Sequence, residues 1–206
     1  MKKIRVLIAD DHSVVRLGLS DLLSDEGSFD VVGTAKNGAE ALALAESQRP
    51  DVVVMDLIMP KMDGIQATKE IKARLPGTAV VVLTSFGSTD GIAAALQAGA
   101  TGAILKNAEN DVLIGVLKRV AAGETVVSAD IRRMLREDPP VPELSPRQKE
   151  ILESITRGLT NTDIANQLGI SVTSVKSHME SLFTKIGAAN RAEAVAIALR
   201  KHLLKI

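Results

Sequence analysis

The 206-residue chain contains no cysteine, tryptophan or tyrosine, and only three phenylalanines and three histidines. Without cysteine it can form no disulfide, thiolate metal site or thiol nucleophile, so any metal must be held by oxygen or histidine. The sequence also lacks an apolar run of the roughly 18 residues that span a membrane, and Met-Lys-Lys leads directly into a strand-like segment instead of a signal peptide. We therefore expect a cytoplasmic protein with no membrane partner.

An excess of charge of one sign is also missing, because 25 basic residues balance 25 acidic ones. The balance does not hold along the chain: residues 1–136 carry about −1, residues 137–143 about −3 and residues 144–206 about +4. The basic excess at the end of the chain indicates a polyanionic partner for that part alone. With 46% hydrophobic residues, the chain can form a folded core.

Short apolar runs alternate with amphipathic stretches across the first 125 residues. The runs are short and rich in β-branched residues, as in buried strands, whereas the amphipathic stretches repeat apolar residues at helical spacing. The expected strands span residues 4–9, 31–35, 52–56, 80–85 and 103–105. This alternation predicts an α/β doubly wound, five-stranded parallel sheet with right-handed crossovers. Functional groups of such sheets lie at the carboxyl ends of the strands.

The composition changes at residues 137–143, which contain three prolines and three acidic residues. Proline fixes φ and removes a backbone donor, so this stretch predicts a stiff, exposed linker. We therefore expect a first domain at residues 1–125, a connecting segment and linker at residues 126–143, and a second domain at residues 144–206.

The second domain has a helical pattern throughout. Ser145 and Thr160 each begin a capping box, and Gly158 and Gly187 follow the ends of amphipathic stretches. The expected helices span residues 145–157, 160–168, 172–186 and 190–202. The pattern predicts a small all-α domain of four helices, in which the second and third helices form a helix-turn-helix.

Acidic, hydroxyl and amine side chains follow the strands of the first domain. Asp10 and Asp11 come after the first strand and Asp56 ends the third, and these two strands are expected to be neighbours. Crowded carboxylates repel one another unless a cation neutralises them, and oxygen ligands favour Mg²⁺. Thr84 ends the fourth strand and Lys106 follows the fifth. A hydroxyl, an ammonium group and a metal together suit a phosphoryl group.

Nearly the whole chain, with these motifs in this order, resembles the response regulators of the NarL/FixJ type, in which a flavodoxin-like receiver precedes a LuxR-type helix-turn-helix output. The resemblance implies that Asp56 accepts a phosphoryl group from a sensor histidine kinase, and that Thr84 and Lys106 contact this group. The receiver would catalyse only its own phosphorylation and dephosphorylation, so no turnover enzyme is expected. The resemblance assigns the Mg²⁺ ion to Asp10, Asp11, Asp56 and the carbonyl of Ile58.

Two other functions remain open. Ala103 stands where receivers commonly carry Tyr, Phe or His, so the chain could be a constitutive DNA-binding regulator with a phosphorylation-independent receiver. It could also be an aspartyl-phosphate hydrolase, although such enzymes usually carry a second acid two residues after the nucleophile, where this chain has Ile58. As a further hypothesis, Ile58 and Phe86 screen an acyl phosphate at Asp56 from water.

Each acidic or basic residue also has a structural interpretation of its own. Asp10 and Asp11 could cap the first helix, and Lys106 could be a solvated surface charge. Their joint occurrence at the ends of several strands of one α/β unit favours the site over these separate interpretations.

The third helix of the second domain is expected to bind double-stranded DNA through a polar face. Its apolar stripe consists of Val175, Met179, Leu182 and Ile186. The resemblance assigns base contacts to Lys176, Ser177 and Glu180, on a polar face that also includes Thr173. The groups expected to hold phosphates are Lys185, Arg191 and the amides near Thr162.

A single domain of this kind has a small interface with DNA, so useful specificity normally requires two half-sites and a dimer. Ala194, Val195 and Leu199 belong to an apolar surface of the fourth helix that could in part pair across a two-fold axis. We expect phosphorylation at Asp56 to favour a homodimer or to free the output face.

Overall fold

The computed structural model describes residues 2–85, 89–141, 144–201 and 203–204. It comprises two compact units, residues 1–139 and residues 140–206, which are described separately. Phe86, which was expected near the phosphoryl site, lies outside the described residues, as do the last two residues of the expected linker. Within the described part of the chain, no helix combines the length and apolarity needed to cross a membrane.

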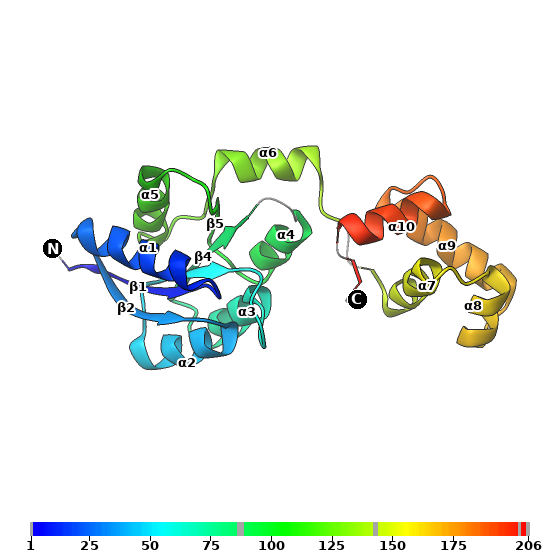
Figure 1. Ribbon diagram of the computed structural model, residues 1–206, viewed down its shortest axis with the longest axis horizontal. Helices are drawn as coiled ribbons and strands as arrows, with labels where there is room; N and C mark the ends of the chain where they lie inside the picture. Colours follow the sequence, from blue (N-terminus) through cyan, green and yellow to red (C-terminus); the bar gives the residue numbers. More distant parts are fainter. Residues whose placement is uncertain (1, 86–88, 142–143, 202, 205–206) are drawn as a thin grey trace. The chain divides into compact units, whose positions relative to one another are not determined.

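The first unit is built on a parallel sheet in the order β2-β1-β3-β4-β5-β6 (Figure 1). Its strands are β1 (Ile4–Ala9), β2 (Phe29–Ala35), β3 (Val52–Asp56), β4 (Ala79–Thr84), β5 (Gly102–Leu105) and β6 (Val126–Val127). The doubly wound parallel arrangement is confirmed, but the sheet has six strands and not five. The sixth strand escaped prediction because two residues are too short to show a period.

Helices cover both faces of this sheet. They are α1 (Ser13–Asp25), α2 (Gly38–Gln48), α3 (Gly64–Arg74), α4 (Thr89–Gln97), α5 (Asn110–Ala121) and α6 (Ala129–Glu137). Because side chains alternate along a strand, Ile8 and Val54 pack in one core with α1 and α5, whereas Leu7 and Val53 pack in another with α2 and α3. The central strand β3 is buried along its whole length.

The segment from residue 126 to residue 137, expected to connect the domains, forms β6 and α6 and packs on the first unit. β6 pairs with β5, and the Ser128 side chain caps α6 by accepting from the N–H of Ile131. Ile131 is fully buried beside α4 and β5. Near the end of α6, the Thr89 hydroxyl donates to Asp138 Oδ2 over 3.1 Å. The strong polarity of α6, with one apolar stripe, concealed it in the sequence.

The second unit contains the four expected helices. They are α7 (Pro146–Thr156), α8 (Asn161–Leu168), α9 (Val172–Ile186) and α10 (Arg191–Arg200). Both expected capping boxes are present, Ser145 with Gln148 and Thr160 with Asp163. Gly169 follows α8 with a φ of 63°, a conformation that glycine adopts without strain, and so allows the tight turn before α9.

Candidate functional site

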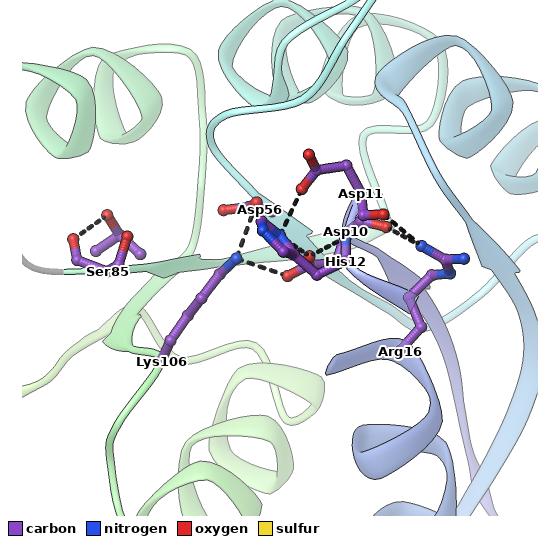
Figure 2. Close-up of polar contacts among 8 residues, drawn as sticks. Asp10, Asp11, His12, Arg16, Asp56, Ser85 and Lys106 are labelled. Carbon is purple, nitrogen blue, oxygen red and sulfur yellow. Dashed lines mark hydrogen bonds and ion pairs between the residues drawn. The ribbon is translucent and has the colours of Figure 1, made fainter. Parts of the chain in front are cut away.

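Three strands bring two carboxylates and one ammonium group together at the carboxyl edge of the sheet. Asp10 follows β1, Asp56 ends β3, and Lys106 follows β5. The Nζ atom of Lys106 lies 2.7 Å from Asp10 Oδ2 and 2.9 Å from Asp56 Oδ2 (Figure 2). Asp10 is 1% exposed and Asp56 5% exposed, so Lys106 neutralises acids that water hardly reaches.

Asp11 and His12 extend this site toward the solvent. The Nδ1 atom of His12 lies 2.8 Å from Asp11 Oδ1 and 3.2 Å from Asp10 Oδ1, and the His12 N–H donates to Asp10 Oδ1 over 2.8 Å. One potential ligand atom from each of Asp10, Asp11, His12 and Asp56 falls within 4.8 Å of the others. Three carboxylates in this arrangement fit a hard divalent cation. His12 was not among the expected site residues, although its place beside two acids in the sequence is a signal.

The turn after β1 is held from the side of α1. The Nη1 atom of Arg16 donates to the carbonyl oxygen of Asp10 over 2.6 Å and to that of Asp11 over 3.0 Å (Figure 2). His12, and neither aspartate, is the N-cap residue of α1, and its side chain makes no capping hydrogen bond. The capping interpretation of Asp10 and Asp11 is therefore wrong. Arg16 carried no recognisable signal in the sequence.

The loop after Asp56 folds back on the strand that it leaves. The N–H of Gly64 donates to the carbonyl of Leu57 over 2.9 Å, and a Cβ atom at position 64 would lie 1.9 Å from the carbonyl oxygen of Asp56. Only glycine fits this approach. The side chain of Ile58, between these two ends, is 77% exposed, which gives no support to the expectation that it screens Asp56.

Thr84 lies at the end of β4 and is 6% exposed. Its hydroxyl donates to the carbonyl of Ser85 over 3.0 Å, and its own carbonyl accepts from the N–H of Lys106 over 2.8 Å. Figure 2 shows Ser85 apart from the group formed by Asp10, Asp11 and His12. The structure thus brings Asp10, Asp56 and Lys106 into contact, with Asp11 nearby, and places Thr84 on the same edge with its hydroxyl bonded locally.

Burial and ion pairing act in opposite directions on the pKa values of Asp56 and Lys106. Burial raises the pKa of Asp56, and this effect together with the nearby charge of Asp10 outweighs the opposite influence of Lys106. Burial also opposes the charge of Lys106, but its contacts with Asp10 and Asp56 raise its pKa above the ordinary value. The site therefore favours the charged form of Lys106 and disfavours the charged form of Asp56.

The second unit presents the expected polar face on α9. The apolar stripe is buried, and the side chains of Thr173, Lys176, Ser177 and Glu180 are exposed. In the first turn of α8, Thr162 is also exposed.

The two basic residues expected to hold phosphates make contacts within the second unit. Lys185 Nζ donates to Gln148 Oε1 over 3.4 Å. The Nη2 atom of Arg191 donates to the carbonyls of Leu159 and Ile155 over 2.5 Å and 3.3 Å, so this guanidinium group closes the end of α7.

Comparisons with known families and proteins match both units. Residues 6–118 match the response regulator receiver domain, and residues 142–198 match the bacterial regulatory proteins of the luxR family. The chain is 34% identical to the transcriptional regulatory protein YdfI of Bacillus subtilis, with 98% of each chain covered. It is 35% identical to the response regulator protein VraR of Staphylococcus aureus, with 98% of this chain and 99% of VraR covered.

Solved structures of response regulators are similar over the same length. ChrA, the response regulator of a heme-sensing two-component system, shares 34% identity with a TM-score of 0.60, covering 99% of this chain and 100% of ChrA. RcsB of Salmonella typhimurium shares 27% identity with a TM-score of 0.75, covering 94% of this chain and 98% of RcsB. An RcsB complex with DNA shares 26% identity with a TM-score of 0.71, covering 97% and 99%.

Proposed function

This chain belongs to the response regulators that join a receiver domain to a LuxR-type DNA-binding domain, and we propose that phosphorylation of Asp56 by a sensor histidine kinase controls its action on transcription. The observation that carries this proposal is the contact between Lys106 and the carboxylates of Asp56 and Asp10 at the carboxyl edge of the sheet. A phosphoryl group on Asp56 would lie within reach of an ammonium group that is already in place.

The proposed reaction transfers a phosphoryl group from a phosphohistidine to Asp56. A carboxylate oxygen of Asp56 forms the new bond to phosphorus while the bond from phosphorus to the histidine nitrogen breaks, and the released imidazole takes up a proton. Lys106 offsets the negative charge of the transferred group, and Thr84 donates a hydrogen bond to it after releasing the carbonyl of Ser85. The receiver acts on itself alone and is not a turnover enzyme.

The acidic group fits the Mg²⁺ ion that receivers use, because it offers three carboxylates within a small radius. The residues that would hold the ion are Asp10, Asp11, Asp56 and the carbonyl of Ile58. A bound Mg²⁺ ion supplies positive charge that lowers the repulsion between the carboxylates and the incoming phosphoryl group. Of these residues, Asp10 contacts Lys106 and Asp11 is exposed to solvent.

For the output, we propose that the polar face of α9 enters the major groove of DNA, with Lys176, Ser177 and Glu180 at the base edges. Thr173 belongs to the same exposed face, and Lys185 and the backbone amides near Thr162 would contact phosphates. Arg191 is less suited to a phosphate contact, because its guanidinium group already binds two carbonyls of its own unit. One solved structure contains two RcsB dimers bound to two parallel DNAs, and we propose a homodimer of this chain on DNA as well.

One observation favours a second candidate, a constitutive DNA-binding regulator with a phosphorylation-independent receiver. Ala103 is fully buried and carries no side chain that could change position on phosphorylation. In this case DNA binding would be the same with and without a phosphoryl group on Asp56.

The deciding experiment treats the full chain with acetyl phosphate and Mg²⁺, and measures the mass of the protein and its affinity for promoter DNA. We expect a phosphorylated species that is absent in Asp56→Asn, together with tighter DNA binding and a higher fraction of dimer. Phosphorylation without any change in DNA affinity would support the constitutive regulator. A chain that takes up no phosphoryl group from either acetyl phosphate or histidine kinases would exclude the proposal.

A further inference from the structure

The turn between β1 and α1 depends on one side chain that no motif assigned. The N–H of Asp10 still bonds within the sheet, to the carbonyl of Ala35 over 3.1 Å, but the chain then leaves β1. Its next two carbonyls, those of Asp10 and Asp11, both accept from Nη1 of Arg16, over 2.6 Å and 3.0 Å. The bond to the Asp10 carbonyl is partly buried, where a backbone acceptor needs a partner, and the same guanidinium group also serves the exposed carbonyl of Asp11.

Arg16 and the site formed by Asp56 and Lys106 lie on opposite sides of the turn after β1. Figure 2 shows Arg16 on one side of the Asp10–Asp11 turn, and Asp56 and Lys106 on the other. With both carbonyls tied to Arg16, the peptide planes of the turn are fixed. The carboxylates that branch from this turn are then presented to the shared site.

Arg16 and Lys106 bind different groups: Lys106 contacts carboxylates, whereas Arg16 contacts backbone carbonyls. Among the residues that the structure describes, the ion pairs of Asp10 and Asp11 involve Lys106 and His12, whereas Arg16 bonds only to carbonyl oxygens. Its positive charge thus lies near the acids and lessens their mutual repulsion without occupying their oxygens. Arg16 itself therefore takes none of these carboxylate oxygens from a cation.

We propose that Arg16 is a positioning residue for the divalent cation, which presets the Asp10 and Asp11 carboxylates by holding the carbonyls of the same two residues. The inference rests on the proposed function, because it assumes that these acids bind Mg²⁺ for the phosphorylation of Asp56. Groups that orient metal ligands from behind typically change metal affinity by roughly 10–100-fold when they are removed.

The test compares the full chain with Arg16→Met and Arg16→Lys. Binding of Mn²⁺, as a probe of the cation site, is measured by electron paramagnetic resonance of the free ion. The rate of phosphorylation by acetyl phosphate is then followed as a function of Mg²⁺ concentration. For Arg16→Met we expect both half-saturating concentrations to rise by roughly 10-fold or more, while the rate at saturating Mg²⁺ returns close to that of the wild type. Arg16→Lys should restore part of the affinity, because an ammonium group can serve one carbonyl.

Arg5→Met is the matched control. Arg5 lies on β1 and, like Arg16, donates through Nη1 to a carbonyl, that of Arg49 over 3.2 Å, but at the end of β1 opposite to Asp10. Its loss should leave the dependence on both cations unchanged. Circular dichroism verifies that each variant is folded, and if Arg16→Met does not fold, the intermediate affinity expected of Arg16→Lys becomes the test.

Three outcomes are distinguishable. A folded Arg16→Met with the cation dependence of the wild type would overturn the inference. A loss of rate that saturating Mg²⁺ does not restore would also overturn it, because Arg16 would then act on the phosphoryl transfer itself. If the wild-type protein neither binds Mn²⁺ nor accepts a phosphoryl group, the proposed function falls, and the inference with it.

Discussion

Ile131 of α6 and Ala103 of β5 belong to one buried cluster, and neither side chain is exposed to solvent. The backbone ties the same two elements together, because the N–H of Ser128 donates to the carbonyl of Ala103 over 3.0 Å. Receivers commonly carry an aromatic residue at this position, where Ala103 has only a methyl group. Helix α6 packs over that methyl group.

A larger side chain at position 103 should therefore disturb the packing of α6 on β5. We expect Ala103→Phe to lower the unfolding free energy of the first unit by about 1–3 kcal/mol through overpacking, and Ile131→Ala to lower it by about 2–5 kcal/mol through a cavity. The double variant should lose less than the sum, because the ring can use the vacated volume. Hydrogen exchange of β5 amides measures these energies within the full chain. Ala129→Phe, at an exposed position of α6, is the control. If the losses caused by Ala103→Phe and Ile131→Ala simply add in the double variant, the contact between these two side chains is contradicted.

Replacing Asp56 with asparagine should stabilise the first unit. Burial raises the pKa of Asp56 above 3.8, so the folded protein keeps this proton at a pH where the unfolded chain has lost it. The stability that protonated Asp56 contributes is fully present below pH 3.8, the pKa of this group in the unfolded chain. It is lost as the pH rises through the pKa of Asp56 in the folded protein. At pH 7 without Mg²⁺ we expect Asp56→Asn to unfold with about 0.5–2 kcal/mol more free energy than the wild type. The difference should shrink in acid, and urea titrations at several pH values measure it.

Removal of Lys106 should leave two buried acids without their shared partner. We expect Lys106→Met to destabilise the first unit by about 3 kcal/mol in the absence of divalent ions, as the loss of one member of a buried ion pair does. Mg²⁺ should restore more stability to this variant than to the wild type, because the ion replaces the missing charge. Thermal unfolding with Mg²⁺ and with a chelator compares the two. Lys118→Met, in an exposed pair with Glu26, should respond to Mg²⁺ like the wild type.

On α9, Lys176 should contribute to DNA recognition. We expect Lys176→Ala to weaken binding to a selected promoter sequence by about 1–3 kcal/mol, and to weaken binding to unrelated DNA less, if the ammonium group contacts a base edge. Fluorescence anisotropy at several salt concentrations measures both affinities. Lys149→Ala, an exposed lysine on α7, is the control. An equal loss on both DNAs, with a salt slope reduced by about one, would assign Lys176 to a phosphate instead.

Arg191 should matter to folding before it matters to DNA. Its guanidinium group binds the carbonyls of Ile155 and Leu159, so Arg191→Met leaves the end of α7 without its partner. We expect the second unit to lose about 1.5–3 kcal/mol of unfolding free energy, while DNA affinity measured well below the unfolding temperature changes little. A stable variant with a large loss of DNA affinity would return Arg191 to the phosphate contacts.

The sheet and the four output helices could be predicted because their signals are local. Buried strands such as β3 are continuous apolar runs, and capping boxes such as that of Ser145 fix the start of a helix within one turn. By contrast, β6 has only two residues, and α6 owes its place to one apolar stripe that includes Ile131. Its burial against β5 is a tertiary contact that no local pattern encodes.

The acids and Lys106 could be predicted because the end of a parallel strand is a position that sequence defines. His12 and Arg16 could not be assigned in the same way. Their contacts depend on the directions in which the carbonyl and carboxylate groups of the turn after β1 point. Thr84 shows a related limit: its position on the edge followed from the sequence, but the present partner of its hydroxyl, the Ser85 carbonyl, did not.

The bond between Gly64 and Leu57 has a practical consequence for redesign. It fastens the two ends of the loop that follows Asp56, so residues 58–63 leave and rejoin the fold at neighbouring points. A grafted loop of the same length must keep the contacts that this loop makes inside, the buried side chain of Met59 and the cap that Asp63 gives to α3. The graft must retain glycine at position 64, since any other residue would push against the Asp56 backbone.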